Sequence, residues 1–223
     1  SRQQFQTNFY HWQLYKHVDG DWYYILPQSW PVPMTPLGAG ENHTWTLTVT
    51  TGRVSDGMDS DTAHGTGSLT IAGLGGGDYA FGADGRFATG SYEGPVALAA
   101  GFELTTDPLQ LTPTTAIPET KQDGETLVAR STRSEAIDDT DQRDIYILER
   151  IDEAEPDTRQ VIIEQVVRND QLRDAIALSQ KHNASRIRLE EFSRSFPPFG
   201  IDDAQTYEFR GDYYRVTTED GSS

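Results

Sequence analysis

A glycine-rich turn followed by a tyrosine, at residues 74–81 (Leu-Gly-Gly-Gly-Asp-Tyr-Ala-Phe), constrains the fold more than any other stretch of the sequence. Glycines permit a tight bend with positive φ. Tyr79 then stands at the start of a β-prone run, where its hydroxyl can reach back to the backbone of the turn, as in the tyrosine corner of β-sandwiches. Phe81 lies two residues further and faces the same side of the strand. An ordinary glycine-rich hairpin is the alternative.

Short β-prone runs separated by turns fill the first half of the chain. Asp19-Gly20 between two aromatic runs predicts a hairpin. Trp45 begins an alternation of apolar residues with threonines, which is typical of a half-buried strand. The expected strands are 9–16, 21–26, 43–50, 68–72, 78–83 and 95–104. This spacing predicts a mainly β protein with an immunoglobulin-like β-sandwich over residues 1–107. Its usual first strand is hard to place, so we expect it to be missing or donated from elsewhere.

Composition changes after a stretch rich in threonine and proline at 108–124, which we interpret as a linker. Asn169 is placed to cap the start of a helix at about 170–182, and Asn183 to end it. The expected strands around this helix are 126–132, 143–151, 159–167, 185–192, 206–210 and 213–218. This order predicts an α+β domain over 125–223, in which one helix packs on an antiparallel sheet.

The charge of the chain is strongly acidic. Asp and Glu number 35 against 18 Lys and Arg, which gives a formal net charge of -17, and only three of the bases are lysines. This composition is expected of a halophilic protein, because a Debye length of about 3 Å in 1 M salt screens such self-repulsion. A merely acidic mesophilic domain is the alternative. The charge disfavours nucleic acid and anionic membrane surfaces as partners.

Cysteine is absent, so disulfides and thiolate metal sites are excluded. No stretch approaches the roughly 20 apolar residues of a spanning helix, so we expect no membrane insertion within this chain. The chain begins at Ser1 rather than Met, and we interpret it as processed or trimmed. We therefore expect a signal or anchor upstream of Ser1 and an extracellular or cell-surface location.

Motifs for catalysis or metal binding are weak throughout the sequence. No histidine spacing matches a metal site, and no nucleophile elbow or phosphate-binding loop is present. Asp56, Asp59 and Asp61 could supply oxygens to Ca²⁺, but their spacing is not that of an EF-hand. We therefore expect no catalytic residues, no cofactor and no enzymatic activity, with calcium as the one open alternative.

Two further groups of residues have both a structural and a functional interpretation. Arginines gather in the last strands, where they can pair with nearby glutamates across strands or form an anion pocket. The acids are equally dense there, which favours pairing. These arginines are Arg186, Arg188, Arg194, Arg210 and Arg215. Asn42 and Asn183 each begin an Asn-x-Ser/Thr sequon and are candidate glycosylation sites.

The densest aromatic run lies near the N-terminus. Packing in the core explains alternate members of the run, and the others can form a contact face for a protein partner, because aromatic residues are enriched in interface cores. The candidate interface residues are Tyr10, Trp12, Trp22, Tyr24 and Trp30.

Four segments together carry a family resemblance: Trp12-x-Leu14-Tyr15-Lys16, Asp19-Gly20-Asp21-Trp22, Gly40-Glu41-x-His43-Thr44-Trp45-Thr46-Leu47 and Gly77-x-Tyr79-x-Phe81-Gly82. They resemble extracytoplasmic (secreted or lipoprotein-like) proteins of halophilic archaea that begin with an immunoglobulin-like domain. The resemblance implies a fold and a habitat but no site residues.

Three functions remain open from the sequence. The first is a non-enzymatic, halophilic cell-surface or secreted protein that acts by protein binding or self-assembly, with an open sandwich edge completed by a neighbouring chain. The second is an enzyme subunit or binding protein that takes an anionic ligand in the arginine-rich second domain. The third is a proteinase inhibitor, because the segment Gly40–Trp45 also resembles small inhibitor sandwiches.

Overall fold

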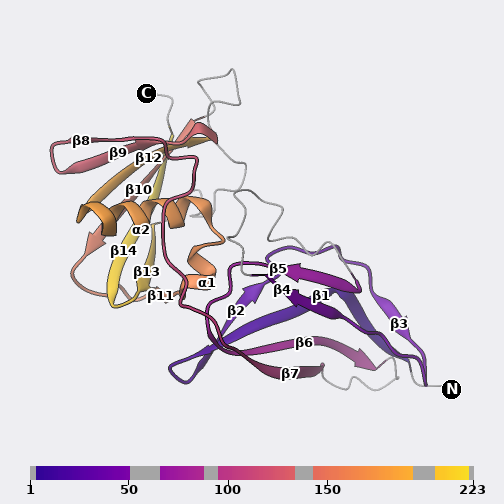
Figure 1. The fold of residues 1–223 in the computed structure, drawn as a ribbon. Coiled ribbons are helices and arrows are strands. Elements are labelled where there is room, and N and C mark those ends of the chain that lie inside the picture. Colours follow the sequence, from indigo (N-terminus) through magenta and orange to yellow (C-terminus); the bar gives the residue numbers. More distant parts are fainter. Residues whose placement is uncertain (1–3, 51–65, 88–94, 134–142, 193–203, 221–223) are drawn as a thin grey trace. The chain divides into compact units, whose positions relative to one another are not determined.

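The fold is mainly β, as expected. The computed structural model describes residues 4–50, 66–87, 95–133, 143–192 and 204–220 (Figure 1). Strands account for 52% and helices for 11% of the structure. The chain divides into two compact units, Ser1–Leu109 and Gln110–Ser223. Each unit is described by itself.

Unit 1 contains two sheets of unequal size. Its strands are β1 (Phe5–Val18), β2 (Asp21–Leu26), β3 (Thr35–Leu37), β4 (Thr46–Val49), β5 (Ser68–Ile71), β6 (Gly77–Phe87) and β7 (Val96–Leu104). The larger sheet is antiparallel in the order β2-β1-β6-β7, with β3 paired to β1. The smaller sheet holds only β4 and β5, which run parallel. Among the described residues the larger sheet thus has five strands and the smaller one has two.

Two local predictions in unit 1 are confirmed. The β1–β2 hairpin turns at Asp19 and Gly20, whose φ angles of 51° and 100° match a turn with two positive-φ positions. Tyr79 is 1% exposed, and its hydroxyl donates a 2.6 Å hydrogen bond to the carbonyl oxygen of Gly75. The tyrosine thus fastens the glycine turn to the start of β6.

Strand β6 extends further than predicted, because its pairing with two neighbours continues to Phe87. Asp84 and Gly85 lie within the strand, opposite Ala97 and Val96 of β7. Strand β1 contains a large bulge: five steps from Thr7 to Trp12 oppose only two steps of β6. Such bulges redirect side chains away from the regular alternation.

Unit 2 consists of a seven-stranded sheet with a helix across one face (Figure 1). Its elements are β8 (Thr120–Asp123), β9 (Thr126–Arg130), β10 (Arg143–Ile151), β11 (Arg159–Gln160), α1 (Ile163–Val166), α2 (Asp170–His182), β12 (Arg186–Phe192), β13 (Gln205–Phe209) and β14 (Asp212–Asp220). The strand order is β11-β13-β14-β10-β12-β9-β8. The pairs β9–β12 and β11–β13 are parallel, so the sheet is mixed rather than antiparallel as predicted.

Helix α2 has the predicted bounds and caps. The side chain of Asn169 accepts a 3.0 Å hydrogen bond from the backbone nitrogen of Leu172, and Asn183 ends the helix in the left-handed conformation with φ of 50°. The apolar side of the helix packs against inward residues of the sheet. This core includes Leu127, Tyr146, Leu148, Leu172, Ile176, Leu178, Ile187, Leu189, Phe209, Tyr214 and Val216.

Two predictions for this half of the chain are wrong. The segment 159–167 is not one strand, because the strand β11 ends at Gln160 and the chain turns into the short helix α1 at Ile163. The segment 108–124 is not a free linker. Thr114 is buried and bonded to Asp174 of α2, Leu111 and Ile117 pack on the core, and β8 pairs with β9. Most of the predicted linker is therefore an integral part of unit 2.

Candidate binding site

The predicted aromatic interface is only partly exposed. Trp12 is 4% exposed because it lies on the inner face of β1 and stacks on Phe81, with ring centroids 5.8 Å apart, so its assignment to a contact face is wrong. Trp22 and Trp30 are exposed, at 53% and 37%. The remaining candidates, Tyr10 and Tyr24, are half-buried.

Each exposed tryptophan contacts a histidine on the outer face of β1. Trp30 lies over His11 with ring centroids 4.0 Å apart, and Trp22 lies beside His17 at 5.0 Å. Between these pairs the half-buried ring of Tyr24 meets Tyr15 edge-on, and the hydroxyl of Tyr24 donates to the carbonyl oxygen of Pro27. These contacts hold the outer aromatic rings in place.

A groove opens on the opposite, inner face of the same sheet. Its aromatic wall begins at the β1 bulge, where Phe9 stacks on His43 with centroids 3.8 Å apart and planes within 4°. The ring of His43 meets Trp45 edge-on at 4.4 Å, and Trp45 in turn meets Phe81 at 6.3 Å. The indole nitrogen of Trp45 donates a 3.0 Å hydrogen bond to the carbonyl oxygen of Phe9. The bulge is thereby joined to the segment that leads into β4.

The floor of the groove is made of small residues of β6 and β7. Ala83 lies opposite Leu98, and Gly82 opposite Ala99. A Cβ at Gly82 would lie 2.4 Å from the carbonyl oxygen of Leu98, so the two strands approach more closely there than any larger residue permits. Small side chains leave space above the strands, and the hollow has a volume of about 400 Å³.

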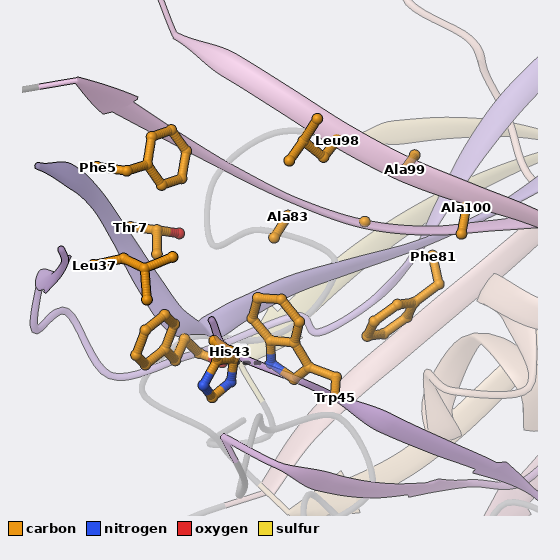
Figure 2. A pocket seen from close by; sticks show the side chains of 12 residues that line it. Phe5, Thr7, Leu37, His43, Trp45, Phe81, Ala83, Leu98, Ala99 and Ala100 are labelled. Carbon is orange, nitrogen blue, oxygen red and sulfur yellow. Dashed lines mark hydrogen bonds between the residues drawn. The ribbon is translucent and has the colours of Figure 1, made fainter. Parts of the chain in front are cut away.

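The rim of the groove is apolar. Figure 2 shows the side chains of Phe5, Leu98 and Phe81 arranged around the hollow, with Trp45 on its lower side. The ring of Phe5 packs edge-on against Phe87. Ligand-binding pockets in proteins are commonly 300–1,000 Å³ and mostly apolar, so this groove is of the size and character that binds apolar groups.

Strand β7 forms one side of the groove and is the edge of its sheet. Among the described strands it pairs only with β6. Its inward residues begin with Val96 and Leu98 and continue with Ala100 and Phe102, yet Leu98 is 69% exposed. The described part of the smaller sheet therefore leaves apolar surface of β7 uncovered.

One polar atom in the groove wall is buried without a hydrogen bond. Among the described residues, Nε2 of His43 has no partner. Buried polar atoms are normally satisfied. A hydrogen-bond donor or acceptor on a bound group would provide Nε2 of His43 with a partner.

The arginines of unit 2 are engaged in ion pairs. Arg130 and Arg188 both bind Glu190, the former at 2.7 Å. Burial acts to raise the pKa of Glu190, but hydrogen bonds from these two guanidinium groups outweigh it, and the pKa is lowered. Arg186 pairs with Glu149 on the neighbouring strand β10, and Arg215 pairs with Glu155 in the segment between β10 and β11.

These pairs use the guanidinium groups that an anionic ligand would need. Arg210 is partnered by the ring of Phe209 through a cation–π contact of 5.1 Å. Arg194 lies outside the described residues. The described arginines thus favour pairing with nearby glutamates over an anion pocket.

A buried charge network fastens the segment before β8 to the rest of unit 2. Arg133 binds Asp174 and Glu191, each at 2.7 Å, and Thr114 donates to Asp174 through its backbone nitrogen and its hydroxyl. Asp174 is fully buried, and this burial raises its pKa despite its hydrogen bonds to Arg133 and Thr114. The network joins the segment before β8 to α2 and β12, so we assign it a structural role.

The other predicted sites remain predictions. Asp56, Asp59 and Asp61 lie outside the described residues, and within the described ones no cluster of three metal-ligating side chains occurs. Asn42 and Asn183 are both exposed, which a glycan acceptor requires. No helix in the described ranges has the length and apolar character needed to cross a membrane.

Sequence reasoning missed the groove. Its residues come from β1, β3, β6, β7 and the segment before β4, and no local pattern brings them together. One signal was available: β7 reads as an alternating strand with apolar or small residues on both faces from Val96 to Phe102. Apolar or small residues on both faces are typical of a strand whose two faces are covered, yet the described residues leave most of β7 exposed.

Comparisons of the chain with protein-family models, with curated proteins and with solved structures found no match.

Proposed function

We propose that this chain is a non-enzymatic binding or assembly protein that takes up a β-strand from another polypeptide at the open side of unit 1. The observation that carries the proposal is the apolar groove beside the edge of β7, neither of which is covered by any of the described strands. Addition of a strand to a sheet edge supplies backbone hydrogen bonds, and alternate side chains of the added strand enter pockets on one face. The edge of β7 offers the backbone groups for these hydrogen bonds, and the groove beside it offers a pocket for the side chains.

Unit 1 is, in this proposal, an immunoglobulin-like sandwich with an incomplete second sheet. The order β2-β1-β6-β7 and the buried tyrosine corner of Tyr79 at the start of β6 support it. The usual first strand of such a sandwich is hard to place in this sequence, and we expect another chain to supply a strand at the open edge. The parallel pairing of β4 with β5 departs from the usual antiparallel arrangement of such sandwiches.

The setting that we propose is the cell surface or the exterior of a halophile. The net charge of -17 and the scarcity of lysine support this setting. At molar salt the repulsion between acidic chains is screened, which permits contacts through an uncharged edge. The described residues give no separate support to an anion-binding or proteinase-inhibiting function.

A library of random extended nonapeptides, displayed on phage and selected on the immobilised chain in molar KCl, tests strand addition. We expect enrichment of peptides with apolar residues at alternate positions, since only one face of an added strand meets the groove. The enrichment should disappear on L98K, which places a charge on the inner face of β7, and persist on T48K, an exposed position of β4. Equal enrichment on L98K and the unaltered chain would refute the proposal.

A further inference from the structure

Strand β7 lacks the features that protect natural sheet edges. Such edges carry lysine, proline or bulges, or are very short. Strand β7 pairs with β6 over nine consecutive positions, from Val96 to Leu104, without a shift of register. Its one charged residue is Glu103. A long, regular and nearly uncharged edge of this kind is a template for pairing with another strand.

We infer that the strand added to β7 is β7 of a second copy of this chain, paired antiparallel about a two-fold axis at Ala100. The inference rests on the proposed function, because it identifies the polypeptide that supplies the strand. A two-fold interface brings the same patch of both subunits together, so the patch must be complementary to itself.

The sequence of β7 meets this requirement. With Ala100 opposite its own copy, Leu98 lies opposite Phe102, and Val96 opposite Leu104. Even-numbered residues then face even-numbered ones, so the inner faces of both sheets lie on the same side. Leu98, which is 69% exposed, gains an aromatic cross-strand neighbour from the second copy.

The distribution of charge favours a second copy over a basic foreign strand. Residues 96–102 carry no charge and offer no carboxylate that would attract lysine or arginine. In the antiparallel register, Glu103 lies opposite Ala97 rather than opposite another glutamate. The remaining obstacle is the net charge of -17 on each chain, and salt near 1 M reduces its range to about 3 Å. Pairing should therefore strengthen as salt rises, whereas attraction to a basic strand would weaken.

Single-cysteine variants test the register directly, because the chain has no cysteine of its own. Antiparallel partners have Cα atoms about 4.5–5.5 Å apart, and a disulfide needs about 4.4–6.8 Å. Under mild oxidation in 3 M KCl, A100C should form a covalent dimer. A97C is the matched control: it is an exposed alanine of the same strand, but its two copies would lie about 20 Å apart. We expect at least five-fold more dimer from A100C.

Light scattering of the uncrosslinked chain provides the second measurement. We expect a dimer in 3 M KCl and a monomer in 0.1 M KCl, with L98K monomeric at both salts and T48K unaffected. Equal crosslinking of A100C and A97C, or a monomer at every salt, overturns self-pairing. If the peptide library still enriches β7-dependent sequences in that case, strand addition stands and the strand comes from another protein. If the library also fails, both proposals fall.

Discussion

At the scale of single residues, Tyr79 shows how one side chain fixes the start of a strand. Its ring lies in the core, stacked on Phe102 at 5.5 Å, and its hydroxyl satisfies the carbonyl of Gly75. The ammonium of Lys16 lies 5.2 Å from the ring centroid. These contacts join β1, the glycine turn, β6 and β7 at one point.

Replacement of Tyr79 by phenylalanine should destabilise the protein by about 1–2 kcal/mol, because it removes a buried hydrogen bond to the carbonyl oxygen of Gly75. Tyr24 provides a matched control, since its hydroxyl also donates to a backbone carbonyl but the side chain is half-buried. Y24F should cost less. Urea unfolding of both variants measures the difference, and an equal effect of the two changes would contradict a special role for the corner.

Residue-level predictions succeeded where the cause is local. Asp19-Gly20, Tyr79 and the caps Asn169 and Asn183 act within a few residues, so sequence alone identifies them. Trp12 was assigned to the wrong side because exposure depends on which face of β1 the rest of the chain covers. That choice is made by strand pairing far away in the sequence.

At the scale of elements, the segment before β8 is held by tertiary contacts rather than by its own propensity. Its threonines and prolines read as a linker, but Thr114 and Arg133 connect it to α2 and β12 through Asp174 and Glu191. The same limitation explains the region 159–167, whose apolar residues fit a strand and a short helix equally well.

Replacement of Arg133 by methionine should destabilise the protein by about 3–5 kcal/mol at pH 7, because two buried carboxylates lose their shared cation. R130M is the matched control: the Arg130 side chain is 58% exposed, and its loss should cost about 1 kcal/mol or less. Urea unfolding in molar KCl measures both.

The loss of unfolding free energy caused by R133M should become smaller as the pH falls. Burial raises the pKa of Asp174, so the folded state holds this proton more tightly than the unfolded state does. Stability from a raised carboxyl pKa is fully present below the unfolded value of about 3.9 and is lost as pH rises through the folded one. Loss of the guanidinium raises the folded pKa further. A difference in unfolding free energy between R133M and the unaltered chain that stays constant from pH 7 to pH 4.5 would contradict this account.

At the scale of the whole molecule, net charge governs stability and association together. A formal charge of -17 opposes compaction of each chain and contact between chains. The sequence was sufficient to predict a mainly β fold and this acidity. It did not predict the groove, because the uncovered part of the sheet follows from the order of strands in space.

Thermal unfolding should therefore depend strongly on salt. The melting temperature in 0.1 M KCl should lie well below that in 3 M KCl, and each kcal/mol of screened repulsion shifts it by about 2–4 °C. A protein of similar size and near-zero net charge, melted in the same buffers, controls for general effects of salt. Equal midpoints would rule out the halophilic setting.

Amide hydrogen exchange of β7, resolved by NMR for each residue, tests strand addition most directly. In 0.1 M KCl the alternate amides that face away from β6 should exchange rapidly, while those bonded to β6 are protected. In 3 M KCl at high protein concentration the rapid set should become protected, and in L98K it should remain rapid. Rapid exchange of these amides in the unaltered chain under every condition would show that β7 takes up no strand from a second copy.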